Sequence, residues 1–300
     1  MLLFYSVWRF IASFLSSGTR LPLFCPPPYI TMNALIFRLW GGFFMQTRER
    51  WHLIDGLRGL ALANMVLYHL LFDVYVIWGF DPLWPARWPV RVWERCICCS
   101  FIFISGLCWH WGRRHALRRG LLLNGFGLLI TAVTLIAVPD QAVWCGVLTF
   151  LGCATLLTIP VDRLLNGRWT AAGLAVNLVL LVVFWPVNQG WLGLGTWRLW
   201  QLPDALYRSR LLTVLGFPFP GFFSSDYFSI LPWYFLFLAG YFARPLLFAI
   251  EQVKQAARLR LPLLDWLGRK SLPVYLVHQP LCMALCVAFL SPASPLCLVN

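Results

Sequence analysis

Charged residues are scarce in this sequence. Only 12% of the 300 residues are Asp, Glu, Lys or Arg, and 11 acidic residues stand against 24 basic ones. Soluble domains carry roughly twice that charged fraction, whereas 60% of this chain is hydrophobic. The shortage of charge excludes an ordinary water-soluble domain and predicts an integral membrane protein.

Motifs of nucleotide and metal chemistry are missing as well. The sequence has no Walker loop, no GxGxxG and no HExxH motif. The run "CICC" at Cys96 to Cys99 has no second CxxC and no histidine pair at ligand spacing, so we predict no metal site. We interpret most of the ten cysteines as small core residues, and we expect no permanently bound cofactor.

The distribution of charge and hydropathy narrows the class further. The net charge of +13 comes from short basic clusters between apolar segments, which argues against a nucleic acid partner. The apolar runs are continuous and do not alternate with a period of two, which argues against a β-barrel. No internal repeat is visible, which weakens a transporter made of duplicated halves.

The apolar segments predict an all-α, polytopic transmembrane helical bundle with about seven spans after Met45. We place the spans at about 53–80, 92–111, 117–138, 142–161, 169–187, 227–250 and 271–290. Residues 1–44 contain three consecutive prolines and form a poorly defined extension. We expect translation to start at Met45, so that 45–300 form the transmembrane domain.

Basic residues orient these spans. They cluster before the first span and between spans two and three, four and five, and six and seven. All these positions fall on one side, which the positive-inside rule assigns to the cytoplasm. The loop of about 40 residues before Tyr227 is then exoplasmic, and its Trp, Gly and Pro content suits a re-entrant or capping element.

The first span carries charge in an apolar context. In "LRGLALANMVLYHLLFDVYVIWG", Arg58 and His69 are eleven residues apart, so they lie about 20° apart around a helix axis and about 16 Å apart along it. Asp73 follows His69 in the i, i+4 relation, and Asp55 precedes Arg58 by one turn. We expect a polar path that enters at Arg58 and ends at a base, His69, whose tautomer Asp73 fixes. The alternative is two structural pairs, one at the interface and one joining helices.

Four sequence blocks resemble a known family. "IDGLRGLALANMVLYHLLFD" resembles the first helix of the membrane acyltransferase superfamily, whose hallmark is an arginine and a histidine separated by ten residues, here Arg58 and His69. "SFIFISGLCWHWGRRHALRRG", "SSDYFSILPWYFLFLAGYF" and "LLDWLGRKSLPVYLVHQPL" resemble bacterial proteins with a heparan-α-glucosaminide N-acetyltransferase catalytic-type domain. The similarity covers about residues 50–290.

The resemblance implies a multi-pass enzyme of the bacterial inner membrane. Such proteins take an acyl group from cytoplasmic acetyl-CoA or another acyl-CoA and pass it to a sugar or similar acceptor on the other side. The chain departs from the lysosomal enzyme, whose active-site histidine lies beyond the first helix. The glucosamine acceptor is therefore not carried over, whereas the pair of Arg58 and His69 is.

Further polar residues are candidates for the same site. His278 and Gln279 lie near mid-membrane and either line a cavity or form a hydrogen-bonded core group at a helix break at Pro280. Ser105 either lines the cavity or serves close helix packing. Asp226 and Tyr227 either contact an acceptor or cap the sixth span.

Arg113 and Arg114 belong to a dense basic loop with Arg118 and Arg119. Guanidinium groups bind phosphate well, so Arg113 and Arg114 join Arg58 as candidates for binding acyl-CoA. Orientation in the membrane and contact with anionic lipid are sufficient alternatives.

These observations favour an acyltransferase, acting on oxygen or nitrogen, that uses His69 as general base. A transient acyl-histidine stays open as an alternative. Two other classes also remain: a transporter or flippase with an intramembrane polar path, and a structural membrane protein. Membrane lipid and a sugar or glycan acceptor are the expected partners, while the acceptor identity, the acyl chain length and the oligomeric state are not predicted.

Overall fold

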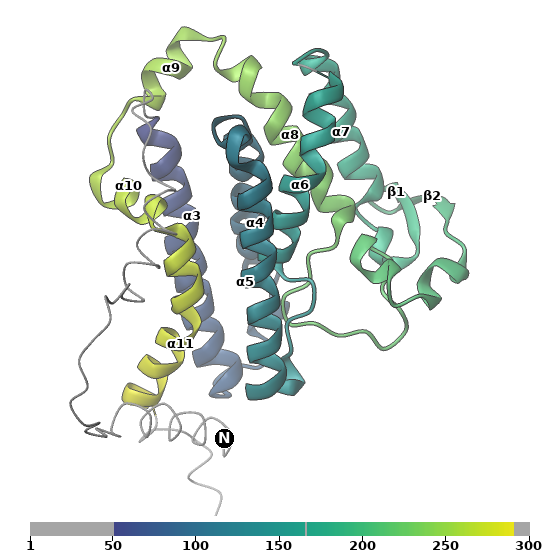
Figure 1. The fold of residues 1–300 in the computed structure, drawn as a ribbon. Helices are drawn as coiled ribbons and strands as arrows, with labels where there is room; N and C mark the ends of the chain where they lie inside the picture. Colours follow the sequence, from purple (N-terminus) through teal and green to yellow (C-terminus); the bar gives the residue numbers. More distant parts are fainter. Residues whose placement is uncertain (1–50, 166, 291–300) are drawn as a thin grey trace, which may run out of the picture.

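The computed structural model describes residues 51–165 and 167–290 and is mainly helical (Figure 1). The predicted all-α fold is confirmed. The expected extension, residues 1–44, lies outside the described residues. Within them the longer helices are α3 (His52–Phe72), α4 (Trp88–Cys108), α5 (Ala116–Ala137), α6 (Val147–Leu165), α7 (Thr170–Phe184), α8 (Ile230–Leu247) and α11 (Ser271–Leu290).

Six continuous helical stretches in the described chain are long and apolar enough to cross a membrane. One of them, Trp88–Ala137, has 50 residues and would measure about 75 Å as a single helix, more than twice the thickness of a bilayer core. A 3-10 helix, Trp109–His115, divides it into α4 and α5. Counting these two separately gives the seven spans that the sequence predicts.

Contacts between helices give the directions of the spans. Trp93 at the start of α4 donates a hydrogen bond to Asn64 in α3 (3.0 Å), and Cys108 at the end of α4 lies beside Arg58. The two helices are therefore antiparallel. We name the end of the bundle that holds Arg58 and the basic 3-10 helix Trp109–His115 the arginine-rich end, and the opposite end the loop end.

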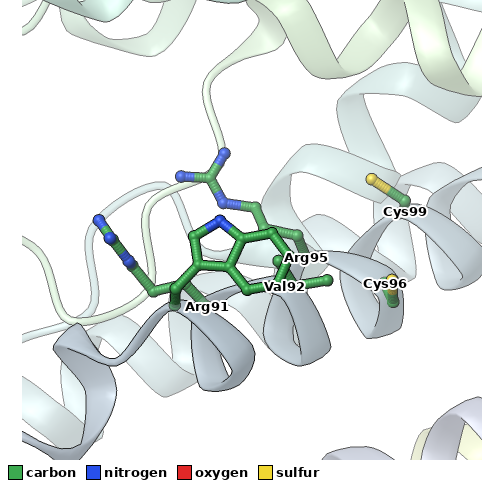
Figure 2. A pocket seen from close by; sticks show the side chains of 6 residues that line it. Arg91, Val92, Arg95, Cys96 and Cys99 are labelled. Atoms are coloured by element: carbon green, nitrogen blue, oxygen red, sulfur yellow. The ribbon is translucent and has the colours of Figure 1, made fainter.

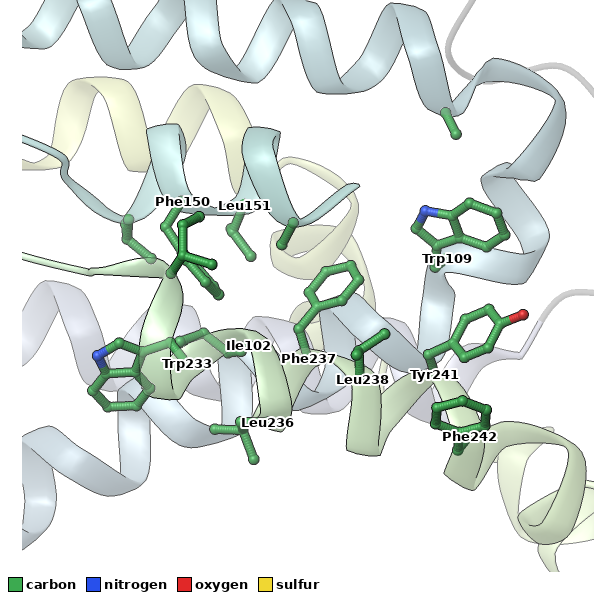
Figure 3. Packing of buried hydrophobic residues seen from close by; sticks show 14 residues of the cluster. Ile102, Trp109, Phe150, Leu151, Trp233, Leu236, Phe237, Leu238, Tyr241 and Phe242 are labelled. Carbon is green, nitrogen blue, oxygen red and sulfur yellow. The ribbon is translucent and has the colours of Figure 1, made fainter. Parts of the chain in front are cut away.

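Helix α8 lies in the core of the bundle. Its aromatic and aliphatic side chains pack with residues of α4 and α6 around Ile102, Phe150, Leu151, Phe237 and Tyr241 (Figure 3). A Cβ atom on Gly106 would lie 1.9 Å from the Phe237 carbonyl oxygen. The crossing of α4 and α8 thus brings backbone against backbone, which only small residues permit.

A short helix, α10 (Pro262–Arg269), packs on the first turns of α3 (Figure 1). A Cβ atom on Gly59 would lie 2.0 Å from the Leu264 carbonyl oxygen, and one on Gly268 would lie 1.8 Å from the Asp55 carbonyl oxygen. The start of α3 is therefore held by a backbone contact from the segment between α8 and α11. Helix α9 (Glu251–Ala257) precedes α10 in that segment.

The long loop between α7 and α8 contains a two-stranded antiparallel hairpin, β1 (Trp191–Leu194) and β2 (Trp197–Gln201), followed by 3-10 turns. The Tyr207 hydroxyl donates to the Val187 carbonyl (2.5 Å) and ties these turns to the end of α7. The segment lies beside the loop ends of α7 and α8 (Figure 1). It contains no membrane-length helix within the described residues.

One helix start and one predicted helix break differ most clearly from the sequence expectation. Helix α6 begins at Val147, not at 142, because residues 142–146 are not helical and the Asp226 carboxylate accepts from the Val147 N–H. The helix break predicted at Pro280 is wrong, since α11 runs unbroken from Ser271 to Leu290. Membrane helices tolerate proline because neighbouring groups satisfy the freed carbonyl.

Candidate functional site

Helices α3 and α11 bring four polar side chains together inside the bundle. Val274 and Tyr275 of α11 pack against a cluster of Leu62, Met65 and Ile97. The Cys282 sulfur of α11 lies 3.8 Å from the Val66 carbonyl oxygen of α3, so the two helices lie side by side. One to two turns further along both helices, His69 and Asp73 of α3 meet His278 and Gln279 of α11. Both helices run from the arginine-rich end toward the loop end, because α10, which packs on the first turns of α3, directly precedes α11 (Figure 1). We call these four residues the polar seam.

The two histidine rings face each other. Their centroids are 4.8 Å apart, with an angle of 61° between the ring planes. The Nδ1 atom of His278 lies 2.6 Å from the Tyr275 carbonyl oxygen. A carbonyl only accepts, so Nδ1 carries the proton, and the Nε2 atom of a neutral His278 keeps its lone pair. This Nε2 atom is buried and has no partner in the described part of the chain.

His69 is held differently from His278. Its ring packs edge-on against Tyr68, with centroids 5.8 Å apart. It is partly exposed, and among residues 51–165 and 167–290 its side chain has no hydrogen-bond partner. Both of its ring nitrogens are thus available to another molecule.

Asp73 bonds across the seam and not along its own helix. Its Oδ1 atom accepts a hydrogen bond from the Gln279 side chain at 2.9 Å. The i, i+4 hydrogen bond to His69 that the sequence suggested is not formed. Asp73 is fully buried and opens a π-helical turn, Asp73–Ile77, a local widening that is frequent at functional sites.

The seam is rich in lone pairs and poor in donors. The Asp73 Oδ2, Gln279 Oε1 and His278 Nε2 atoms are buried without a partner in the described chain. Leaving such an atom unpaired costs roughly 1–3 kcal/mol. Such an arrangement is suited to taking up a proton or a donor group from another molecule.

Arg58 and His69 share a face of α3, but no continuous polar path joins them. Leu62 and Met65 lie on that face between them, 0% and 8% exposed, within a hydrophobic cluster. Arg58 therefore belongs to a separate cluster at the arginine-rich end, about 16 Å away along the axis.

That cluster contains residues of three helices. Arg58 contacts the Asp55 carboxylate at 3.4 Å, as the sequence suggested, and also donates to the Cys108 sulfur at 2.9 Å. Arg119 of α5 lies across Gly112, where a Cβ atom would be 2.4 Å from its Nη1 atom. Arg119 also interacts electrostatically with Cys108 and Arg58. Two guanidinium groups thus gather at this end.

Arg113 and Arg114 have different environments. Arg113 forms an ion pair with the buried Asp162 at 2.5 Å, and the Tyr241 hydroxyl donates to the same carboxylate at 2.7 Å. The Arg113 charge is therefore partly compensated within the protein. Arg114 is exposed.

Ser105 has a local partner. Its hydroxyl donates to the Phe101 carbonyl at 2.7 Å, one turn back on α4. It lies next to Gly106, at the crossing with α8. The contacts of Ser105 are those of close helix packing, the alternative that the sequence left open.

Asp226 caps a helix, but not the one that follows it. Its Oδ2 atom accepts from the Val147 backbone N–H at 3.0 Å, at the start of α6, and lies 3.5 Å from the Tyr275 hydroxyl. Burial is the main cause that raises the pKa of Asp226 from 3.8 to about 6, and the nearby Glu94 acts in the same direction. The Tyr227 hydroxyl donates to the Thr213 carbonyl.

A family model described as "Heparan-alpha-glucosaminide N-acetyltransferase, catalytic" matches residues 50–280. The chain belongs to this family. No curated protein and no solved structure matches it. The match confirms the predicted resemblance to proteins with a heparan-α-glucosaminide N-acetyltransferase catalytic-type domain.

The heparan-alpha-glucosaminide N-acetyltransferase catalytic family match covers both polar clusters of the candidate site. The matched region contains the polar seam and the cluster around Arg58. Together with the membrane-length helices, it assigns the chain to acetyltransferase-type membrane proteins.

Three residues of these clusters were not singled out from the sequence. Tyr275 fixes the His278 ring through its backbone carbonyl, and Cys108 lies beside Arg58. Neither contact leaves a signal in a sequence, because both depend on the backbone or on a distant helix. Arg119 was visible within the basic loop, but no pattern indicated that it is the arginine that lies across Gly112 and interacts electrostatically with Cys108.

Proposed function

We propose that this chain transfers an acetyl or another acyl group from acyl-CoA to a hydroxyl or amine of a sugar or other envelope acceptor. The observation that carries the proposal is the pair of His69 and His278 inside a family-matched membrane bundle. His69 is the general base, because its ring nitrogens have no partner among the described side chains.

The chemistry follows from the groups present. His69 takes the proton of the acceptor O–H or N–H while the acceptor oxygen or nitrogen attacks the thioester carbonyl. The carbon–sulfur bond then breaks, and the leaving CoA thiolate receives a proton. The protonated His69 is the nearest source of that proton, so the base returns to its starting state.

Other residues position this base. Asp73 holds Gln279 by a hydrogen bond across the seam, which fixes the register of α11 against α3 and so keeps His278 beside His69. Arg58 and Arg119 lie at the arginine-rich end, where guanidinium groups suit the phosphates of CoA. CoA carries its thioester on a long arm, which suits a base about 16 Å further along α3.

This proposal includes an orientation. We place the arginine-rich end on the cytoplasmic side of a bacterial inner membrane, because acyl-CoA is found in the cytoplasm. The acceptor then approaches from the loop end.

The test is transfer of isotopically labelled acetyl-CoA into glycans and lipids of membranes containing the full chain, followed by mass spectrometry for an added acetyl mass. His69→Ala is expected to lower transfer by about 10²–10⁴-fold, the usual contribution of a general base. His115→Ala is the matched control, because this exposed histidine lies outside the seam. Transfer by His69→Ala at the rate of the control would remove His69 from its role.

A further inference from the structure

A shallow groove of about 460 Å³ lies on one face of α4, away from the site described above. It is near the loop end of the helix (Figure 2). The lining residues all come from α4 and recur every three or four positions: Trp88, Arg91, Val92, Arg95, Cys96 and Cys99. This spacing places them on one side of the helix.

The groove carries two like charges. Arg91 and Arg95 are one turn apart, and both are exposed. Within the described residues neither forms an ion pair with a carboxylate, whereas Arg87 pairs with Asp81 at 2.6 Å. Like charges at this spacing repel each other, so the pair favours an anion from outside the chain.

The contacts of Arg95 also leave its positive charge available to an external anion. Its guanidinium lies 5.1 Å from the centre of the Trp185 ring, a contact that keeps the positive charge. Glu94 interacts with Arg95 electrostatically, but it also interacts with Tyr68 and Asp226. Tyr68 belongs to α3, so Glu94 serves the helix contact and is not part of the groove.

The groove lies where lipid is expected. α4 is part of a membrane-length stretch, and Trp88 is 71% exposed, as is typical of residues at a membrane interface. Arg95 lies seven residues further into the helix, about 10 Å deeper. A guanidinium at that depth reaches toward the headgroup layer or meets an anion.

We propose that this groove binds an anionic phospholipid of the bilayer. Its phosphate lies between Arg91 and Arg95, whose planar guanidinium groups suit phosphate oxygens. One acyl chain lies along Val92, Cys96 and Cys99, which form the apolar part of the groove. The net negative charge distinguishes this ligand from a zwitterionic lipid.

The test is native mass spectrometry of the purified full chain in detergent, titrated with phosphatidylglycerol or with phosphatidylcholine. Wild type is expected to retain one phosphatidylglycerol in preference to phosphatidylcholine. Arg91→Gln combined with Arg95→Gln is expected to weaken phosphatidylglycerol binding at least about tenfold, because charge-assisted bonds to phosphate are lost. Arg87→Gln is the matched control, since its charge is already paired with Asp81.

Two results would overturn the proposal. One is equal binding of phosphatidylglycerol by wild type and the double variant, and the other is equal binding of both lipids by wild type. A third arm adds undecaprenyl phosphate, and its displacement of phosphatidylglycerol at equal concentration would assign the groove to an isoprenoid carrier instead. If the double variant does not purify, Arg91→Gln alone decides the question, with the rise in Tm on adding phosphatidylglycerol as second readout.

Discussion

At the scale of single residues, Asp226 links the start of α6 to α11 through Val147 and Tyr275. Burial raises its pKa from 3.8 to about 6. The folded state therefore holds the proton more tightly than the unfolded state, so this carboxyl costs stability as the pH rises from about 4 through about 6.

The prediction concerns Asp226→Asn, which keeps an oxygen for the Val147 N–H but cannot ionise. We compare the free energy of unfolding of the variant with that of wild type. This difference is expected to favour the variant more at pH 8 than at pH 4.5, by on the order of 2 kcal/mol. Thermal unfolding of both proteins in detergent at the two pH values measures this. A difference between them that does not change with pH would contradict the prediction.

The polar residues of α3 show which parts of the candidate site could be predicted from the sequence. The common face of Arg58 and His69 follows from helix geometry, and α3 is continuous over both residues, from His52 to Phe72. The predicted polar path from Arg58 to His69 is interrupted, because Leu62 and Met65 lie between them on this face. Helix geometry gives the direction of a side chain but does not identify the residues that pack around it. The partner of Asp73 was also out of reach, since Gln279 is 206 residues away in the chain.

At the scale of helices, the contact between α3 and α10 depends on glycine. A Cβ atom on Gly59 would overlap the Leu264 carbonyl oxygen at 2.0 Å. Backbone cannot give way as a flexible side chain does, so the two helices must separate. The same separation would pull Asp265 of α10 away from His52, which it contacts at 3.3 Å.

We therefore expect Gly59→Ala to destabilise the protein by roughly 1–3 kcal/mol, as overpacking does. Gly125→Ala is the control, because a Cβ atom there meets nothing within 4 Å and alanine favours helix. Thermal unfolding of both variants in detergent compares them. A Tm for Gly59→Ala equal to that of Gly125→Ala would show that the helices absorb the extra methyl group.

Helix existence could be predicted from the sequence better than helix ends. Long apolar runs gave the spans, because a bilayer demands a minimum length. The start of α6 depends on Asp226, which lies 79 residues away from Val147. The hairpin of β1 and β2 was expected only as a re-entrant or capping element, since its composition of Trp, Gly and Pro does not specify strands.

At the scale of the whole molecule, the arrangement of helices makes the orientation testable. His115 lies in the basic 3-10 helix at the arginine-rich end, and Thr196 lies between β1 and β2, beyond the loop end of α7. Both are exposed. With the arginine-rich end in the cytoplasm, the two positions lie on opposite sides of the membrane.

In intact cells, we expect a cysteine at Thr196 to react with a membrane-impermeant maleimide. A cysteine at His115 is expected to react only after the cells are permeabilised. The unmodified chain measures the background from native cysteines such as the exposed Cys96. The reverse pattern of labelling would invert the orientation. The loop end, and not Arg58 and Arg119, would then face the side on which the proposed function places acyl-CoA.

The position of α8 has a consequence for biogenesis. Among the six membrane-length stretches of the described chain, the one formed by α8 is the most enclosed within the bundle and has the lowest mean hydropathy. Its packing partners α4, α6 and α7 all precede it in the sequence. This least hydrophobic span is therefore synthesised after the helices that enclose it. Contacts with those helices then stabilise its insertion more than its own partitioning into lipid does.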